Sequence, residues 1–382
     1  MSQLSVVIFT FNRPAFLREA LESVARQTAR SAITELIVSE NSEFNESRAV
    51  CEEFRDRLPI VWVQQRPPVS PLHHLPRVWG QIRCPTVALL HDDDWWAPNH
   101  LEAALKVLDC QPDCTASYSS YFLSVGPRHW YSVAEVAWFV WLSSGCNFEN
   151  DEAVFLDEAG VMSSCLLNAS LHYSTLVGRT EAIGEAYARV VATENPFDTD
   201  RVFPVLLRLL GPIAYQTAPD TFVRVHAGQD SMQPRYTARG FALLRDTDRW
   251  LLQTYPAVVS EAAKRFNEAA SRLKGQDHVL NYIWGTAHNR IKEPHWSTLV
   301  RECGFDLRRL APGGVLGGRI SPESRRLVWG LLPPLLFESL RQLAWRAVAF
   351  RREQPAWIER FWPGRKRPRP SSESDSGVGN AS

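Results

Sequence analysis

The sequence VALLHDDDWW, residues 87–96, contains the pattern that decides the predicted fold. Residues 86–90 have the length and hydrophobic character of a strand buried on both faces of a parallel sheet. Three aspartates, residues 92–94, follow this strand almost directly. Because parallel sheets bind ligands at the carboxyl ends of their strands, the segment predicts a strand that presents three carboxylates to a binding site.

The same order of strand, polar turn and helix occurs earlier in the chain. The predicted strands are residues 4–9, 35–39 and 60–63, and the predicted helices are residues 15–28, 46–56, 76–82 and 98–108. This alternation predicts βαβ units, which form an α/β domain with a mainly parallel central sheet flanked by helices. The polar turns at 10–13 and 39–42 should therefore meet the turn at 91–94 at one edge of the sheet.

The pattern after residue 115 is more mixed. Residues 172–177 (HYSTLV) predict a strand, and a helix is predicted to begin near Thr180. A further helix is predicted at about 202–210, one or two strands at 215–225, and mainly helix from about 236. The residues from Pro363 are rich in arginine and proline, then in serine and glycine, which is typical of a disordered tail.

The composition is that of a globular protein without a charge bias. Of the 382 residues, 42 are basic and 42 are acidic, so no nucleic acid partner is expected. The start MSQLSVV lacks the features of a signal peptide, and no apolar stretch reaches the length of a transmembrane helix. Seven cysteines without a secretory signal predict reduced thiols and a cytoplasmic protein.

Three adjacent carboxylates repel one another and raise one another's pKa, so their placement at a strand end is costly unless a cation binds there. Carboxylate oxygens suit Mn²⁺ or Mg²⁺, and such a cation usually also binds substrate phosphates. The alternative is a solvated acidic turn before the helix that Pro98 begins, because acidic groups also favour a helix N-terminus.

Three blocks of sequence carry a resemblance to a known family. They are LSVVIFTFNRPAFLREALESVARQT (4–28), ELIVSENS (35–42) and VALLHDDDWWAPNHLEAAL (87–105). In order and spacing they resemble the nucleotide-binding half of family 2 glycosyltransferases, which have the GT-A fold. The resemblance extends over residues 1 to about 230. It implies an enzyme that transfers a sugar from a nucleotide-sugar donor with the help of Mn²⁺ or Mg²⁺.

The resemblance also implies roles for particular residues. Those expected to bind the donor are Thr10, Asn12, Arg13, Glu40, Arg77 and Asp92, and those expected to bind the metal are Asp93, Asp94 and His226. Glu40 stands where the family more often has aspartate, and His91 stands where many members have an acid. His226 belongs to an Arg-x-His pattern in which Arg224 is a further candidate phosphate partner; a structural role for His226 is the alternative.

Glycosyl transfer also needs a base that takes the proton of the acceptor hydroxyl, and a carboxylate suffices. Family 2 enzymes place this acid before a helix, and the segment ENPFDTDRVFPVLLRLLG (194–211) fits that place. Asp200 is the predicted base and Asp198 the alternative; either residue could instead cap the helix. By resemblance, the reaction is one in-line displacement that inverts the configuration of the sugar.

The C-terminal third has two interpretations. Residues 335–352 can form an amphipathic helix, and residues 335–369 combine aromatic residues with arginines in a way that suits a membrane surface. The alternative is a helix whose apolar stripe packs on the catalytic domain. Contact with a membrane would place the protein at the inner face of the membrane.

The sequence thus predicts three regions. These are a GT-A catalytic domain (1–235), a helical extension (236–362) and a disordered tail (363–382). The expected function is inverting glycosyl transfer from a UDP-, GDP- or dTDP-sugar to a glycan or lipid-linked acceptor, in the synthesis of a cell-surface polysaccharide or glycolipid. The alternatives are a sugar nucleotidyltransferase, whose usual Gly-rich loop is absent after the first strand, and a non-catalytic binding or scaffold protein.

Overall fold

The computed structural model of the protein describes residues 3–44, 46–124, 130–132, 153–167, 171–192, 199–224, 226, 246–272 and 304. Several predictions concern parts of the chain that lie outside the described residues. These parts are Asp198, the alternative catalytic base, the segment 335–369 and the tail 363–382. In the described part, no helix is both long enough and apolar enough to cross a membrane.

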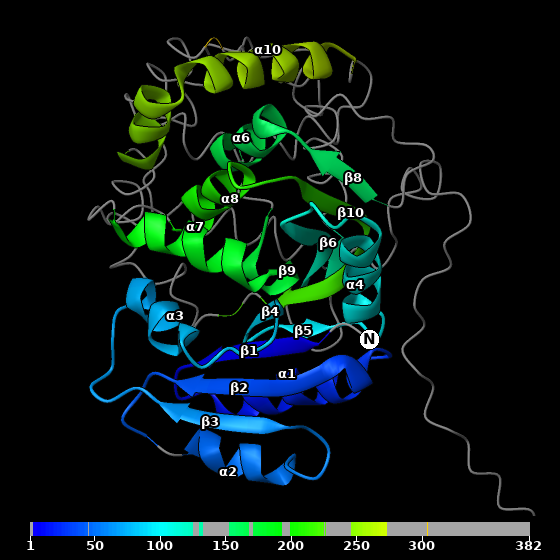
Figure 1. Cartoon of the computed structure of the whole chain (residues 1–382), viewed down its shortest axis with the longest axis vertical. Helices are drawn as coiled ribbons and strands as arrows, with labels where there is room; N and C mark the ends of the chain where they lie inside the picture. Colours follow the sequence, from blue (N-terminus) through cyan, green and yellow to red (C-terminus); the bar gives the residue numbers. More distant parts are fainter. Residues whose placement is uncertain are drawn as a thin grey trace, which may run out of the picture.

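The first part of the sheet consists of four parallel strands in the order β3-β2-β1-β4 (Figure 1). They are β1 (Leu4–Thr10), β2 (Ile33–Glu40), β3 (Ile60–Gln64) and β4 (Thr86–His91). The register pairs Thr10 with Glu40 and Phe9 with His91. The carboxyl ends of β1, β2 and β4 are therefore level, as the sequence predicted.

Beyond β4 the sheet continues through shorter, mixed pairings. β4 is followed by β9 (Val177–Arg179), β6 (Ala116–Ser124), β10 (Ile213–Arg224) and β5 (Trp95–Trp96), while β7 (Trp130–Ser132) pairs with β6 and β8 (Ala153–Leu156) with β10. β6 and β10 are parallel, whereas β9, β5, β7 and β8 join antiparallel. The longest ladders are thus parallel, in agreement with the predicted α/β class.

Helices cover both faces of the sheet, which explains why β1 and β4 are apolar at most positions. Alternate residues of β1 enter two different cores: Val6 and Ile8 pack with α1 (Pro14–Ala25), α2 (Glu46–Glu53) and α4 (His100–Cys110), and Val7 packs on the other side. The second core includes α3 (Pro71–Trp79), α6 (Glu158–Leu167), α7 (Thr180–Ala192) and α8 (Thr199–Arg208).

Two predicted elements differ in the structure. The helix predicted at 76–82 is α3, which begins at Pro71 and contains Pro76 in its interior. Residues 172–177 are not a strand: Tyr173–Thr175 form a 3₁₀ helix, η2. The Nδ1 atom of His172 accepts the N–H of Ser174 at 3.2 Å, and its carbonyl accepts the Thr175 hydroxyl at 2.8 Å. Such local side-chain and backbone hydrogen bonds compete with strand pairing, which begins only at Val177.

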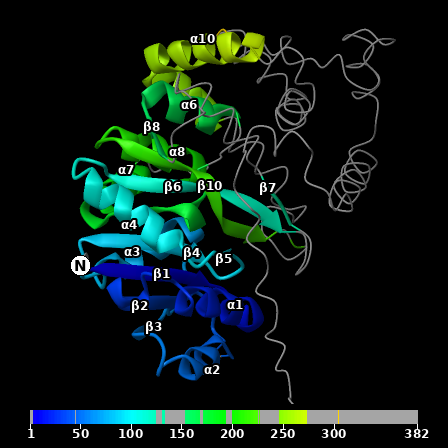
Figure 2. The same ribbon diagram turned by 90° about the vertical axis from the view of Figure 1, so that its right-hand side faces the viewer.

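Part of the predicted helical extension belongs to the second core. Residues 246–254 are helical, and α10 (Pro256–Arg272) lies against α6 (Figures 1 and 2). Leu251, Val259 and Phe266 are fully buried in the same cluster as Met162 of α6 and Val202 of α8. The apolar stripe of these helices therefore packs on the protein itself.

Gly184 offers a test of the packing between α7 and α3. A Cβ atom at Gly184 would lie 2.3 Å from the indole nitrogen of Trp79. Alanine normally stabilises a helix interior by about 1 kcal/mol relative to glycine, but here the displaced indole should reverse the sign. We expect Gly184→Ala to lower the free energy of unfolding by about 1–3 kcal/mol in urea denaturation.

Gly80→Ala is the matched control, because no atom lies within 4 Å of the place that its new methyl group would occupy and its backbone is in the right-handed helical region. This control should be neutral or stabilising by up to about 1 kcal/mol. A stabilising effect of Gly184→Ala would contradict the close contact with Trp79.

Candidate functional site

The turns after β1 and β4 are joined by hydrogen bonds at the carboxyl edge of the sheet. The N–H of Phe11 donates to Oδ2 of Asp92 at 3.1 Å. Nη1 of Arg13 lies 3.2 Å from Oδ1 of Asp92 and 3.0 Å from Oδ2 of Asp93. Asn12 adopts a φ of 50°, in the left-handed region that asparagine tolerates better than most residues. This turn brings the backbone and the guanidinium of one loop to the acids of another.

The turn after β2 reaches the same place. The N–H of Asn12 donates to Oε1 of Glu40 at 3.1 Å. Glu40 is fully buried, and its second oxygen, Oε2, has no hydrogen-bond partner among the described residues. Thr10 is also buried there. The prediction that the three turns meet is confirmed, and Glu40 presents an unused acceptor at their junction.

The three carboxylates differ in charge state. Burial raises the pKa of Asp92 and that of Asp94 to about 7, and the negative charge of Asp93 between them adds to both shifts. Burial also acts to raise the pKa of Asp93, but attraction to His91, His226 and Arg13 outweighs it, so this pKa is lowered. The triplet is therefore one ionised carboxylate flanked by two that hold their protons easily, which is the state expected of crowded acids without a counterion.

Asp94 is enclosed by protein groups. Its Oδ2 accepts the hydroxyl of Ser174 at 2.5 Å, and its Oδ1 accepts the N–H of Arg224 at 2.9 Å. His91 and His172 also lie close, and the ligand atoms of these two histidines and Asp94 are all within 4.8 Å of one another. Carboxylate and imidazole together are a donor set that fits a divalent cation.

Asp93 has a histidine on its other side. Nε2 of His226 lies 3.1 Å from Oδ2 of Asp93, and the imidazole packs against the ring of Phe16 at 4.9 Å between centroids. Two ligand atoms bound to one cation at about 2.2 Å would be separated by a similar distance. Of the residues predicted to bind metal, Asp93 and His226 are thus in direct contact, while Asp94 faces Ser174.

Arg224 is held inside the protein and is not an open phosphate partner. Its guanidinium lies between the rings of Phe16 and Trp95, at 4.5 and 4.6 Å from their centroids. Nε donates to the carbonyl of Asp93 at 2.9 Å, and Nη2 lies 2.5 Å from Oε2 of Glu19. Arg224 therefore ties the end of β10 to α1 and to the acidic turn. Sequence reasoning missed this role and that of Ser174, because neither residue has a local signal for it.

For the remaining predicted residues, Arg77, Asp200 and Asp198, the described part of the structure shows no contact with the triplet. Arg77 is exposed in the last turn of α3, and the contacts found among the described residues do not connect it with the acids. Asp200 is the second residue of α8, and its side chain lies outside what the structure describes, as does the whole of Asp198. The donor role of Arg77 and the choice of base stay predictions.

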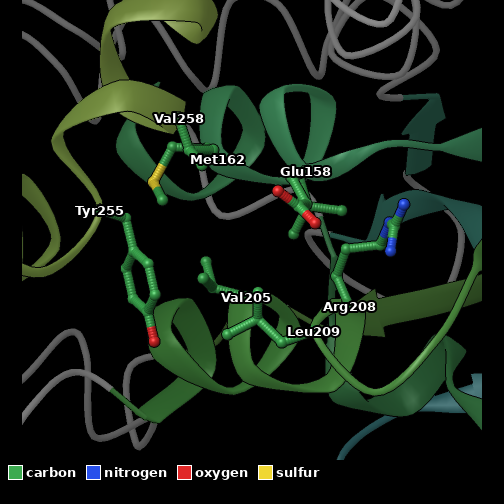
Figure 3. Close-up of a pocket in the computed structure, with 8 residues that line it drawn as sticks. Glu158, Met162, Val205, Arg208, Leu209, Tyr255 and Val258 are labelled. Atoms are coloured by element: carbon green, nitrogen blue, oxygen red, sulfur yellow. The ribbon is translucent and has the colours of Figure 1, made fainter.

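A cavity of about 220 Å³, partly open to solvent, lies between α6, α8 and α10 (Figure 3). Apolar side chains such as Met162, Val205 and Tyr255 line it, with Glu158 and Arg208 at one side. The acids of the triplet do not line this cavity, and its lining is mainly apolar. It is therefore a packing gap between helices, and the chemistry belongs to the sheet edge.

Comparison with known proteins assigns the class. Residues 5–169, somewhat less than half of the chain, match the model of the family described as glycosyl transferase family 2. The curated proteins yield no match at the level of sequence. Residues 5–169 thus carry a family 2 glycosyltransferase domain, as the sequence predicted.

Solved structures resemble this chain at low sequence identity. S. aureus TarS 1–349 in complex with UDP-GlcNAc is 15% identical, with a TM-score of 0.51 over 81% of this chain and 89% of that one. A longer S. aureus TarS structure (15%, TM-score 0.49) is matched over 81% of this chain and only 54% of its own length. The mannosyltransferase PcManGT from Pyrobaculum calidifontis, in complex with GDP-Man and Mn²⁺, is 13% identical (TM-score 0.44; 82% and 86% covered). The fold is of the GT-A type.

The stacked position of Arg224 can be tested by Arg224→Lys. Lysine keeps the charge but loses the planar group that lies between Phe16 and Trp95 and the donor to the carbonyl of Asp93. We expect the free energy of unfolding to fall by about 2 kcal/mol in urea denaturation, from the lost stacking and hydrogen bond.

Glu19→Gln is the control, since Glu19 is half exposed and its ion pair with Arg224 should contribute less than about 1 kcal/mol. Equal losses in the two variants would show that the ion pair, and not the stacking, holds Arg224.

Proposed function

We propose that the protein transfers a sugar from a nucleotide-sugar donor to a hydroxyl acceptor with inversion of configuration, assisted by a divalent cation. The observation that carries the proposal is the convergence of Glu40, Asp92 and Asp93 on one edge of a parallel sheet, joined through the turn that contains Asn12 and Arg13. This edge is where open α/β sheets bind ligands. The family match of residues 5–169 supports the same conclusion.

The donor nucleotide is proposed to lie across the ends of β1 and β2. Oε2 of Glu40 has no partner among the described residues and is proposed to accept a hydrogen bond from an N–H of the base; because this oxygen is fully buried, the turn that contains Asn12 must move to expose it. Asp92, fixed by the N–H of Phe11, is proposed to receive the ribose. Uracil, guanine and thymine all carry a ring N–H, so UDP-, GDP- and dTDP-sugars remain the candidate donors. The UDP-GlcNAc in the TarS complex is in line with this class.

The metal is proposed to bind at Asp93 and His226, with Asp94 beside them. A carboxylate and an imidazole suit Mn²⁺ well, while Mg²⁺ favours oxygen ligands. When bound, the cation supplies positive charge that offsets the charge of the departing diphosphate. Arg13, which already bridges Asp92 and Asp93, can turn from these acids to a phosphate of the donor.

Asp200 is proposed as the base. Its carboxylate takes the proton of the acceptor hydroxyl while the acceptor oxygen forms a bond to the anomeric carbon. The bond from that carbon to the diphosphate oxygen breaks on the opposite face, which inverts the configuration. Asp200 lies in the first turn of α8, which agrees with the expected place of this acid at the start of a helix.

The acceptor is proposed to be a glycan or a lipid-linked glycan that is extended in cell-surface polysaccharide or glycolipid synthesis. The transfer is proposed to take place in the cytoplasm. Contact of residues 335–369 with a membrane surface is part of this proposal, because a lipid-linked acceptor would be held at the membrane. The free cysteines of the described residues accord with reducing surroundings.

Calorimetric titration with UDP, GDP, CMP and dTDP, each with and without Mn²⁺, tests the donor site. We expect one nucleotide to bind tightly only with the metal. Asp93→Asn should weaken this metal-dependent binding about 10- to 100-fold, because it removes the ionised ligand of the triplet, without changing the far-UV circular dichroism spectrum.

Asp56→Asn, the same change at an exposed acid, is the control and should bind like the wild type. Unchanged metal-dependent binding in Asp93→Asn would contradict the metal assignment, and a folded protein that binds none of the nucleotides would contradict the donor site.

The base is tested by Asp200→Asn and Asp198→Asn, a matched pair of changes two residues apart. The assay is release of nucleoside diphosphate, with water as acceptor, from UDP-GlcNAc, GDP-mannose or dTDP-glucose, whichever carries the nucleotide found by calorimetry. Asp200→Asn should retain nucleotide affinity and lose turnover by at least about 100-fold, because the proton acceptor is gone. A loss confined to Asp198→Asn would assign the base to Asp198.

A further inference from the structure

An ion pair is buried away from the acidic turn, between α8 and the helical residues 246–254. Nη2 of Arg201 lies 2.8 Å from Oδ1 of Asp248, and the two side chains are only 1% and 2% exposed. Nε of Arg201 also donates to the carbonyl of Cys165 in α6. One guanidinium thus connects three helical segments that are far apart in sequence.

Buried apolar residues lie close to this pair in sequence. Val202, Phe203 and Leu251, neighbours of the two charged residues in sequence, are buried in the same hydrophobic cluster. Removing two charges from water is costly, and replacing a buried ion pair with well-packed apolar side chains is often neutral or stabilising. Stability alone therefore gives little reason for charges here. The 2.8 Å contact between Nη2 of Arg201 and Oδ1 of Asp248 does not have hydrogen-bond geometry, so what the pair provides is electrostatic attraction that holds α8 and the helical residues 246–254 together.

The pair acts on the first turn of α8. Arg201 is the third residue of this helix and directly follows Asp200. The first four N–H groups of a helix have no partner within the helix, so its first turn is easily displaced. Contacts from Arg201 to α6 on one side and to Asp248 on the other fix both the position and the rotation of this turn.

We propose that Arg201 and Asp248 are positioning residues that hold the carboxylate of Asp200 at the acceptor oxygen. The inference rests on the proposed role of Asp200 as base. It makes the helix at 246–254, which lies well beyond the family-matched residues 5–169, a part of the catalytic apparatus. Misplacement of a catalytic group by about 1 Å can lower a rate by about 100-fold, so a modest shift of the turn would be enough to matter.

The test separates positioning from stability by replacing the whole pair with apolar residues, in Arg201→Met/Asp248→Leu. Three quantities are measured: the melting temperature, the metal-dependent affinity for the nucleotide found by calorimetry, and turnover in the diphosphate-release assay. We expect a melting temperature equal to or above that of the wild type, nucleotide affinity within about twofold, and turnover reduced about 10- to 100-fold. A folded double variant with turnover within about twofold of the wild type would overturn the inference.

Arg208→Met is the matched control, because Arg208 lies in the last turn of the same helix and also donates to a backbone carbonyl, that of Leu156. It should keep wild-type turnover; a loss as large as that of the double variant would indicate a general effect of α8 and overturn the inference. If the double variant does not fold, Asp248→Asn, which removes the charge at constant size, provides the same comparison. Normal turnover in folded Asp248→Asn would then be the overturning result.

Asp200→Asn is assayed in parallel to distinguish the two proposals. Loss of turnover in Asp200→Asn with normal turnover in the double variant removes the positioning role and leaves the base in place. Normal turnover in Asp200→Asn removes the base and the positioning role together. Loss in both, with nucleotide affinity retained, supports both.

Discussion

The structure depends on how three adjacent carboxylates are held at the end of one buried strand. Crowded acids in a low-dielectric environment would repel one another and take up protons, and the raised pKa values of Asp92 and Asp94 show that this cost is present. It is reduced by donors from every side: the N–H of Phe11, the guanidinium of Arg13, the hydroxyl of Ser174 and the N–H of Arg224. A cation bound by the same acids would reduce the repulsion between the carboxylates further.

The donors also explain why the site needs much more of the chain than the acidic segment itself. β1 contributes the turn with Arg13, η2 contributes Ser174, and the end of β10 contributes Arg224 and His226. The parallel pairing of β1 with β4 places the turn that contains Arg13 beside the acids. The antiparallel pairing of β5 with β10 places Arg224 and His226 beside them. The family-matched residues 5–169 end before η2 and β10, yet Asp94 is bonded to both. The groups that restrain the acids therefore come both from the family-matched residues and from residues beyond them.

The same division explains what the sequence could and could not predict. Strand positions and the meeting of the three turns follow from local patterns, because a buried parallel strand is apolar throughout and its ligand-facing end is polar. The roles of Ser174 and Arg224 do not follow from local patterns. Ser174 is 80 residues from Asp94 in sequence and Arg224 is 130 residues from it, and nothing in either local segment indicates the hydrogen bond. Residues 172–177 misled the prediction for a related reason: their β-branched and aromatic composition favours a strand, but hydrogen bonds to His172 close a tight turn instead.

Amphipathic patterns have a similar limit. They predicted mainly helix from about residue 236 but did not indicate which charged residues are buried, and Asp248 is buried opposite Arg201 of α8. A charge pattern cannot reveal a buried partner that lies far away in the sequence, so such residues are assigned to the surface by default. Where burial is tolerated, the charged side chains must be held by several elements at once, and this gives them a fixed orientation. The buried acids of the triplet belong to the proposed donor site. The buried charge of Arg201 directly follows Asp200, which is proposed to act on the acceptor. In this fold, buried charge is therefore more informative about chemistry than the partly open cavity between α6, α8 and α10, whose lining is mainly apolar.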